Sequence, residues 1–207
     1  MKQEEKTKRT RQRIIAAALE EFGTKSYESA SINVICSRSK ISKGLLYYNF
    51  KSKDELYLQC VTICYDEMAG FLKAKNLELY DAEKSLQKIL ETRQQFFEEN
   101  PYLSNIFFNS VLQPPKHLLL DIQKIRQEFD KFYTACYRNL LNHLTLRDGI
   151  TEEMAMEYFS MFVEMFNGFF QRKVDQGNDY HAFIQDHEGA LSDILKIMLY
   201  GIAQEKS

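Results

Sequence analysis

The segment from Ser31 to Leu56 constrains the fold of this chain more than any other. Its sequence is SINVICSRSKISKGLLYYNFKSKDEL, and its apolar residues recur at the spacing of two short helices separated by a tight turn. A serine stands before each short helix as a candidate N-cap, and Ser52 followed by Glu55 has the spacing of a capping box. We therefore expect short helices capped by Ser31 and Ser42, and a long helix that opens at Ser52.

Helical patterns also fill the rest of the chain. Three prolines and eight glycines in 207 residues leave long runs of Leu, Glu, Lys, Gln and Met, which are good helix formers. No stretch alternates apolar and polar residues between hairpin turns, so strands are not expected. We predict an all-α fold of about nine helices. The expected ranges are about 7–22, 31–37, 42–48, 52–71, 81–99, 101–111, 115–145, 151–176 and 180–204.

Two turns are marked by glycine. Gly23 follows the first helix, where a left-handed C-cap is expected. Asp148-Gly149 is a second turn, and it separates two of the long helices.

Charge is divided unevenly along the chain. Residues 1–53 contain 12 Lys or Arg and 5 Glu, a net charge of +7, whereas residues 54–207 contain 15 basic and 24 acidic side chains, a net charge of −9. A basic head on an acidic body attracts phosphate at one end only. The polar N-terminus lacks the apolar segment of a signal peptide, and no apolar run approaches the ~20 residues that span a bilayer. We expect a soluble, cytoplasmic protein without a membrane partner.

The segment supplies what a helix-turn-helix needs, since the second helix of that motif enters the major groove of DNA. Lys43 can reach guanine acceptors or a phosphate, Leu45 can touch a thymine methyl, and Gly44 lets the backbone approach base edges. The expected partner is double-stranded DNA. The small core beneath this helix is predicted to contain Ile32, Ile35, Ile41, Leu46 and Phe50.

Other residues of the basic half can hold phosphates. Tyr47 and Tyr48 carry hydroxyl donors, and Lys53 lies in the first turn of the next helix, where free backbone N–H groups favour anions. Taken singly, each of these residues is more often ordinary packing or solvated surface, but the combined set favours DNA binding. A basic arm that could follow the duplex is formed by Lys6, Lys8, Arg9, Arg11 and Arg13.

These motifs resemble the N-terminal DNA-binding domain of the TetR family of bacterial transcriptional regulators. The family pattern is approximately Thr-x-x-x-Ile-Ala-x-x-Ala-Gly-Val-Ser-x-Gly-x-Leu-Tyr-x-His-Phe-x-x-Lys-Glu-x-Leu, and the resemblance covers about residues 7–60. Matching positions are Ile35, Ser42, Gly44, Leu46, Tyr47, Phe50, Lys53 and Leu56, with Ser31 for Thr, Ile41 for Val and Asp54 for Glu.

The resemblance implies a domain organisation and a set of contacts. Residues 1–52 are expected to form a three-helix DNA-binding domain, and residues 53–207 a helical ligand-binding and dimerisation domain. Lys40 departs from the pattern because glycine is preferred in the turn, and a left-handed lysine there costs on the order of 1 kcal/mol. Asn49 replaces the usual histidine. The residues expected to approach bases are Lys43, Gly44 and Leu45, and those expected to hold phosphates are Ser31, Ser42, Tyr47, Tyr48 and Lys53.

The helix expected at about 151–176 is apolar around much of its circumference, so it must be buried on more than one side. We therefore predict a homodimer joined by this helix and the helix at about 180–204, whose two-fold symmetry matches a palindromic site. The family resemblance implies the same four-helix interface.

The resemblance also implies a ligand cavity in the C-terminal body. Phe and Met linings suit an apolar or aromatic small molecule. The four histidines, at 117, 143, 181 and 187, show no metal-ligand spacing and are expected at the surface or at caps, and the four cysteines are expected to be packed thiols. The candidate ligand-binding residues are Phe97, Phe107, Tyr133, Tyr137, Phe162 and Phe166.

The sequence thus predicts a transcriptional repressor that binds a palindromic operator as a dimer and is released by a small-molecule effector. No phosphate loop, nucleophile elbow or metal motif is present, so neither catalysis nor a cofactor is expected. Two other classes remain open: an all-α dimeric adaptor acting through protein partners, and a small-molecule-binding enzyme.

Overall fold

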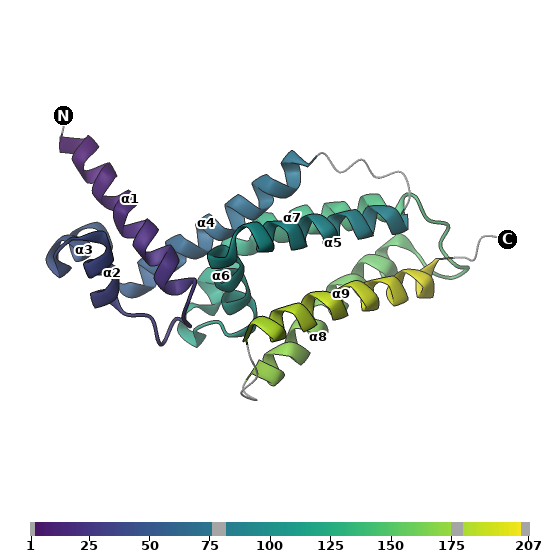
Figure 1. Ribbon diagram of the computed structural model, residues 1–207. Helices are drawn as coiled ribbons and strands as arrows, with labels where there is room; N and C mark the ends of the chain where they lie inside the picture. Colours follow the sequence, from purple (N-terminus) through teal and green to yellow (C-terminus); the bar gives the residue numbers. More distant parts are fainter. Residues whose placement is uncertain (1–2, 76–81, 175–179, 204–207) are drawn as a thin grey trace. The chain divides into compact units, whose positions relative to one another are not determined.

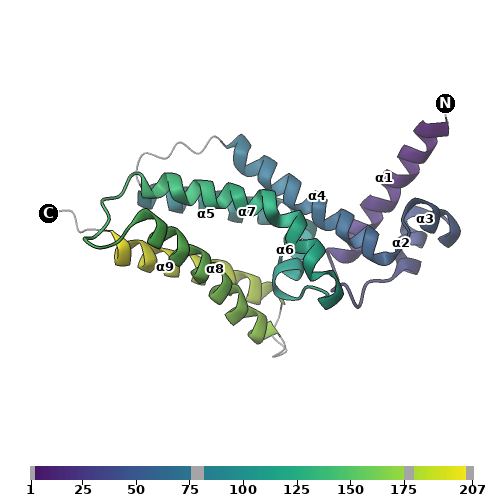
Figure 2. The same ribbon diagram turned by 180° about the vertical axis from the view of Figure 1, so that it is seen from behind.

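The computed structural model describes residues 3–75, 82–174 and 180–203, and within these ranges helices joined by turns and loops make up the chain and no strand is present (Figures 1 and 2). The all-α prediction is confirmed. None of the described helices is both long and apolar enough to cross a membrane. The elements are α1 (Gln3–Phe22), α2 (Ile32–Ser39), α3 (Lys43–Asn49), α4 (Lys53–Ala74), α5 (Ala82–Glu99), α6 (Pro101–Leu112), the 3-10 turn η1 (Lys116–Leu118), α7 (Leu119–Leu141), α8 (Glu152–Val174) and α9 (Tyr180–Ile202).

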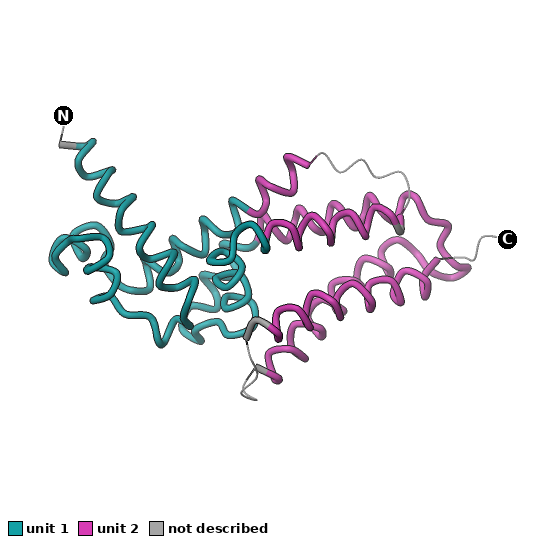
Figure 3. The backbone as a smooth tube through the Cα atoms, in the orientation of Figure 1, with its two compact units in different colours: residues 1–67, 97–126 teal, residues 68–96, 127–207 magenta. Residues whose placement is uncertain are grey.

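The chain packs into two compact units (Figure 3). Unit 1 consists of residues 1–67 and 97–126, and unit 2 consists of residues 68–96 and 127–207. These units are defined by packing, so the domain boundary predicted after residue 52 stays a prediction.

The core of unit 1 joins the first helix to the two short helices. Ile14, Ala18 and Phe22 of α1 are completely buried, as are Ile35 of α2 and Leu46 of α3. Phe50, which follows α3, is also completely buried, whereas Ile32 and Ile41 are half-buried. The predicted small core is therefore present, with three of its five members at its centre.

Gly23 is required for packing, not for a left-handed C-cap. In the described chain, a positive φ occurs at Gly149 and at Lys40, and Gly23 is not among them. A Cβ atom on Gly23 would lie 2.5 Å from the carbonyl oxygen of Leu19 and 2.5 Å from Cβ of Tyr102 on α6. The amide of Asn105 donates to the carbonyl of Gly23 at 2.7 Å. The expectation of a left-handed Gly23 was wrong, because the close approach of α6 to the end of α1 is what excludes a side chain.

Helix α7 ends earlier than expected. The sequence pattern predicted a helix to about residue 145, but the chain leaves α7 at Leu141. After this point the backbone N–H of Arg147 donates to the carbonyl of Ile202 at 3.0 Å, and its side chain donates to Ala203 and Tyr200 at 2.9 and 3.1 Å. The segment that contains Arg147 turns toward the end of α9 and donates hydrogen bonds to the carbonyl groups there. A helix cannot continue through that turn.

A buried polar cluster lies in the core of unit 2, where α8 and α9 run side by side (Figures 1 and 2). Arg93 of α5 donates twice to Glu188 of α9, at 2.8 and 2.9 Å. His187 is 2% exposed, and its ring centroid lies 4.8 Å from those of Phe166 and of Phe170. His187 also contacts Glu188 at 3.0 Å and Asn167 at 3.4 Å.

The expectation of surface or cap histidines was therefore wrong for His187, because an acid neighbour and an amide stabilise it inside the core. His117 and His143 are exposed, as expected, and the side chain of His181 lies outside the described residues. Burial lowers the pKa of His187 despite the opposing influence of Glu188. Conversely, Glu188 has a lowered pKa because Arg93 and His187 outweigh the effect of its burial.

Candidate nucleic-acid interface

Helix α3 presents a mostly exposed surface. Leu46 fixes it to the core of unit 1, while Lys43 and Gly44 in its first turn are exposed. Leu45 and Tyr47 are each 41% exposed and Tyr48 is 80% exposed. Apolar and aromatic side chains are costly to leave in water, so their exposure on one short helix marks a candidate contact surface.

Local sequence explains how α3 begins. The hydroxyl oxygen of Ser42 accepts a hydrogen bond from the N–H of Leu45 at 3.2 Å, so the predicted cap is confirmed. The Ser42 hydroxyl can still donate its hydrogen to a phosphate. A Cβ atom on Gly44 would meet nothing within 4 Å, so the space beside this position is open to a binding partner. Asn49 is engaged within the helix, since its amide donates to the carbonyl of Leu45 at 2.8 Å.

The turn between α2 and α3 contains a left-handed residue at Lys40, where the family pattern prefers glycine. Lys40 has φ 54° and ψ 48°. Its N–H donates to the carbonyl of Ser37 at 3.2 Å, and the N–H of Ile41 donates to that of Cys36 at 3.1 Å. This pair of bonds is a Schellman motif, which usually has glycine at the left-handed position. The backbone thus follows the helix-turn-helix pattern even though lysine disfavours it.

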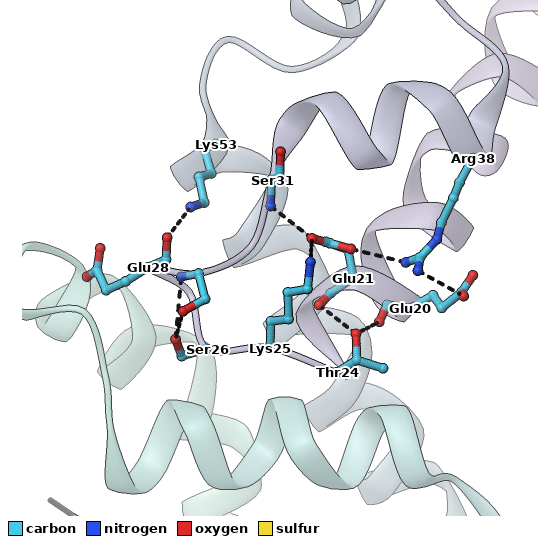
Figure 4. Close-up of polar contacts among 10 residues, drawn as sticks. Glu20, Glu21, Thr24, Lys25, Ser26, Glu28, Ser31, Arg38 and Lys53 are labelled. Atoms are coloured by element: carbon cyan, nitrogen blue, oxygen red, sulfur yellow. Dashed lines mark hydrogen bonds and ion pairs between the residues drawn. The ribbon is translucent and has the colours of Figure 1, made fainter.

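Lys53 begins α4 and lies against neighbouring groups of unit 1. Its ammonium is 4.5 Å from the ring centroid of Tyr27. It also lies 3.5 Å from the carbonyl oxygen of Glu28 (Figure 4). The Tyr27 hydroxyl donates to Asp54, which His117 also contacts at 3.3 Å. Burial, followed by the hydrogen bond to Asp54, raises the pKa of Tyr27, so the phenol stays protonated as a donor.

The start of α4 has most of the predicted capping box. The N–H of Glu55 donates to the Ser52 hydroxyl at 3.1 Å, as expected. The Glu55 carboxylate, however, accepts from the N–H of Lys51 at 2.7 Å, one residue before the expected position. These two hydrogen bonds fix the Ser52 side chain and the first turn of α4, which contains Lys53.

The five basic residues expected to form an arm lie on α1 itself, and they divide into two groups. Lys6, Lys8 and Arg9 are exposed. Arg11 donates to the carbonyl of Asn49 at 2.8 Å, and Arg13 donates to the carbonyls of Ser39 and Lys40. The arm that follows the duplex stays a prediction, and two of its five residues also bind the helix-turn-helix backbone.

Glu21 supports the short helices from within the core, a role that the sequence pattern did not reveal. Its carboxylate is fully buried and accepts from Lys25 at 2.8 Å, from the N–H of Ser31 at 3.0 Å and from Arg38 at 3.1 Å (Figure 4). Burial alone would raise the pKa of Glu21, but these hydrogen bonds and charges outweigh it and the pKa is lowered. The available signal was its position seven residues after Ile14, on the apolar stripe of α1.

Ser31 differs from its predicted role as a cap. It precedes α2 with an extended backbone, but its hydroxyl makes no capping hydrogen bond. The Glu21 carboxylate instead accepts from its N–H, which places a negative charge near the N-terminus of α2. The half-buried Ser31 therefore has its backbone fixed by α1, and its predicted phosphate contact stays a prediction.

The six candidate ligand-binding residues do not all belong to one unit. Phe97 and Phe107 lie in unit 1, with ring centroids 5.2 Å apart. The other four lie in unit 2, where Phe162 and Phe166 have centroids 5.7 Å apart and Tyr137 stacks on Phe159 at 4.0 Å. The hydroxyls of Tyr137 and Tyr133 are buried, and Tyr133 lies beside Arg93.

Helix α2, the Schellman turn at Lys40 and the exposed helix α3 form a helix-turn-helix, and the capped start of α4 follows it. Two family models match the chain. The model for bacterial regulatory proteins of the tetR family matches residues 14–60, and the model for the tetracyclin repressor-like C-terminal domain matches residues 80–201. The second match covers more than half of the 207 residues, so the chain belongs to the TetR family.

Two curated transcriptional regulators are similar in sequence to part of this chain. The HTH-type transcriptional regulator YerO of Bacillus subtilis is 26% identical over 128 residues, 59% of this chain and 44% of YerO. The biofilm operon icaADBC HTH-type negative transcriptional regulator IcaR of Staphylococcus aureus is 31% identical over 86 residues, 42% of this chain and 43% of IcaR. The matched parts span less than half the length of these two curated relatives.

A solved structure supports the same fold. A TetR family transcriptional regulator from Agrobacterium tumefaciens superimposes with a TM-score of 0.64 and 15% identity, over 96% of this chain and all of that one. At this identity the likeness concerns the fold alone.

Proposed function

We propose that this protein is a transcriptional repressor that binds a palindromic DNA operator as a dimer and is released by a small-molecule effector. The observation that carries the proposal is the exposed surface of α3, where Tyr48 is 80% exposed beside Lys43 and Gly44 in a net basic half of the chain. Family membership supports a regulator over an adaptor or an enzyme. The name of IcaR, a negative transcriptional regulator, supports repression over activation.

Within this proposal, Lys43, Gly44 and Leu45 approach base edges in the major groove. Phosphates are held by groups on either side of the groove. Tyr47 and Tyr48 offer exposed hydroxyls, and Lys53 can leave the Tyr27 ring for a phosphate because both contacts of its ammonium are weak. Ser31 and Ser42 contribute hydroxyl donors next to the N-termini of α2 and α3.

The proposed dimer forms through α8 and α9. Five large apolar side chains recur every three or four residues along α8 and are 42–63% exposed, which describes a continuous stripe on one face. A second copy of the chain is the natural cover for such a stripe, because a two-fold axis makes it self-complementary. The stripe contains Met154, Tyr158, Met161, Met165 and Phe169, and Ile194, Ile197 and Tyr200 of α9 are also exposed.

The proposed effector is an apolar or aromatic small molecule that can also accept a hydrogen bond. The hydroxyl of Tyr137 is buried and bonds to none of the described residues, and burial raises its pKa to about 12, so it remains a donor. A buried unsatisfied donor costs about 1–3 kcal/mol, which a ligand acceptor would recover. The predicted lining residues Tyr133, Phe162 and Phe166 belong to the same unit as Tyr137, and the part of Phe97 and Phe107 in ligand binding stays a prediction.

The effector and DNA are proposed to act through α4. This helix begins with Lys53 and its residues belong to both compact units. An effector that prefers the conformation with mis-spaced α3 helices weakens DNA binding, and the coupling is reciprocal, typically about 1–3 kcal/mol. Since its target is bacterial DNA, the proposed location is the cytoplasm.

The direct test is to select fragments of the source organism's genomic DNA with purified protein and to sequence the bound fraction. The proposal predicts enrichment of a palindromic sequence over random fragments. An equal recovery of all fragments would overturn DNA reading and would favour the adaptor class.

A further inference from the structure

Two arginines of α1 bind the C-terminal ends of both helices of the helix-turn-helix. Arg13 donates through one nitrogen, Nη2, to the carbonyls of Ser39 and Lys40, the latter at 3.3 Å. These two carbonyls end α2, and the Schellman bonds from Lys40 and Ile41 go to other groups, at Ser37 and Cys36. Arg13 thus supplies a donor that the turn itself does not supply.

Arg11 makes the equivalent contact at the end of α3. Its Nη1 atom donates to the carbonyl of Asn49 at 2.8 Å, and its Nη2 atom donates to the side chain of Gln59 on α4 at 3.2 Å. The guanidinium carbon also lies 4.0 Å from the ring centroid of Phe50. One side chain of α1 therefore ties the end of α3 to α4 and to the buried Phe50.

The physical need for such contacts follows from helix length. Helices α2 and α3 contain 8 and 7 residues, and isolated helices shorter than about 12–15 residues are marginal in water. The last four carbonyls of a helix have no partner within it, and a cation near them is favourable. Contacts at the ends of α2 and α3 therefore determine how firmly the exposed face of α3 is oriented.

The opposite end of α2 is held from the same helix. Glu21 of α1 accepts the N–H of Ser31, just before α2, so α1 places a carboxylate at the start of α2 and a guanidinium at its end. Both charges complement the dipole of α2. Helix α1 therefore contacts α2 at both ends, with the negative Glu21 at its N-terminus and the positive Arg13 at its C-terminus.

We propose that Arg11 and Arg13 are positioning residues for DNA reading: they fix the orientation of α3 through backbone carbonyls instead of neutralising phosphates. This inference rests on the proposed DNA-binding function. It predicts that loss of either arginine lowers discrimination between the operator and random DNA, whereas loss of Arg9, which binds no backbone carbonyl of the helix-turn-helix in the described structure, weakens binding to both duplexes equally.

The test compares Arg11→Gln and Arg13→Gln with Arg9→Gln, which removes the same charge from an arginine whose side chain is 64% exposed. Affinity is measured for the selected operator and for a random duplex of equal length across a salt series. Relative to Arg9→Gln, each positioning variant should lose about tenfold in the operator-to-random ratio. The slope of log affinity against log salt should stay at the wild-type value in both positioning variants.

Amide hydrogen exchange without DNA provides a second readout. Arg13→Gln should speed exchange at Lys40 and Ile41, and Arg11→Gln should do so near Phe50, while Arg9→Gln leaves both regions unchanged. Circular dichroism confirms that each variant keeps its helical content.

Three results overturn the inference. The first is a salt slope that falls by about one from the wild-type value in Arg11→Gln or Arg13→Gln, which would make that arginine a phosphate contact. The second is an operator-to-random ratio equal to that of Arg9→Gln, and the third is unchanged exchange in both turns. If instead the wild-type protein prefers no duplex, the proposed function fails, and the exchange result still decides whether the two arginines hold the turns.

Discussion

At the scale of single residues, buried charge determines how the DNA-binding half is held together. The Glu21 carboxylate joins α1 to Ser31 before α2 and to Arg38 within it. A buried carboxylate is tolerated only when donors surround it, and Lys25 supplies a third. The recognition surface therefore depends on a residue that would touch no DNA.

Replacing Glu21 with Gln should lower the free energy of unfolding by about 1–3 kcal/mol at pH 7, because charge-assisted hydrogen bonds become neutral ones. The folded-state pKa of Glu21 is lowered, so its stabilisation is complete above the unfolded pKa of about 4.3 and is lost as pH falls through the folded value. Urea unfolding at pH 7, 5, 4 and 3 should show the gap between wild type and variant narrowing below about pH 4. A gap that stays constant over this range would contradict the assignment.

The residue scale also shows why prediction succeeded in some places and failed in others. The Ser42 cap depends on the N–H of Leu45 three positions later, so local spacing was sufficient to predict it. Arg13 and Ser39 are 26 positions apart, and Arg11 and Asn49 are 38 apart. Nothing in the periodicity of α1 distinguishes these arginines from Lys8 or Arg9, because their partners are backbone carbonyls.

At the scale of elements, helix positions followed from sequence but some helix ends did not. Helix α1 begins at Gln3, earlier than expected, and α7 ends at Leu141 because the next residues turn toward the end of α9. Arg147 then donates to the carbonyls that end α9, as Arg11 and Arg13 do for α3 and α2. Long-range contacts of this kind set the ends that periodicity cannot place.

The Arg93–Glu188 pair, which joins α5 to α9, gives a prediction at this scale. Arg93→Met should destabilise the protein by about 3–5 kcal/mol, because it removes both hydrogen bonds that Arg93 donates and leaves the buried Glu188 charge without its cationic partner. The double variant Arg93→Met with Glu188→Leu should be more stable than Arg93→Met alone. The urea midpoints of the two variants measure this difference in stability. A double variant less stable than Arg93→Met would refute the role of the uncompensated Glu188 charge.

At the scale of the whole molecule, the exposed stripe on α8 should determine whether the protein is a dimer. Met165→Asp should raise the dimer dissociation constant by at least about a hundredfold, because symmetry buries the new charge twice. Sedimentation equilibrium measures this dissociation constant. Leu120→Asp, at a site on α7 that is 71% exposed and outside the stripe, is the matched control and should remain dimeric. A monomeric wild type, or a Met165→Asp variant that dimerises normally, would exclude this interface.

Helix α3 is proposed to read DNA bases, and a titration of one of its lysine variants separates base reading from general attraction to phosphate. Wild type, Lys43→Ala and the control Lys124→Ala, whose side chain is 71% exposed on α7, are titrated onto the selected operator and onto a random duplex. The account predicts that Lys43→Ala loses about 1–3 kcal/mol of operator affinity, far more than it loses for random DNA, while Lys124→Ala binds as wild type does. If Lys43→Ala keeps wild-type affinity and discrimination on the operator, α3 does not read the bases as proposed.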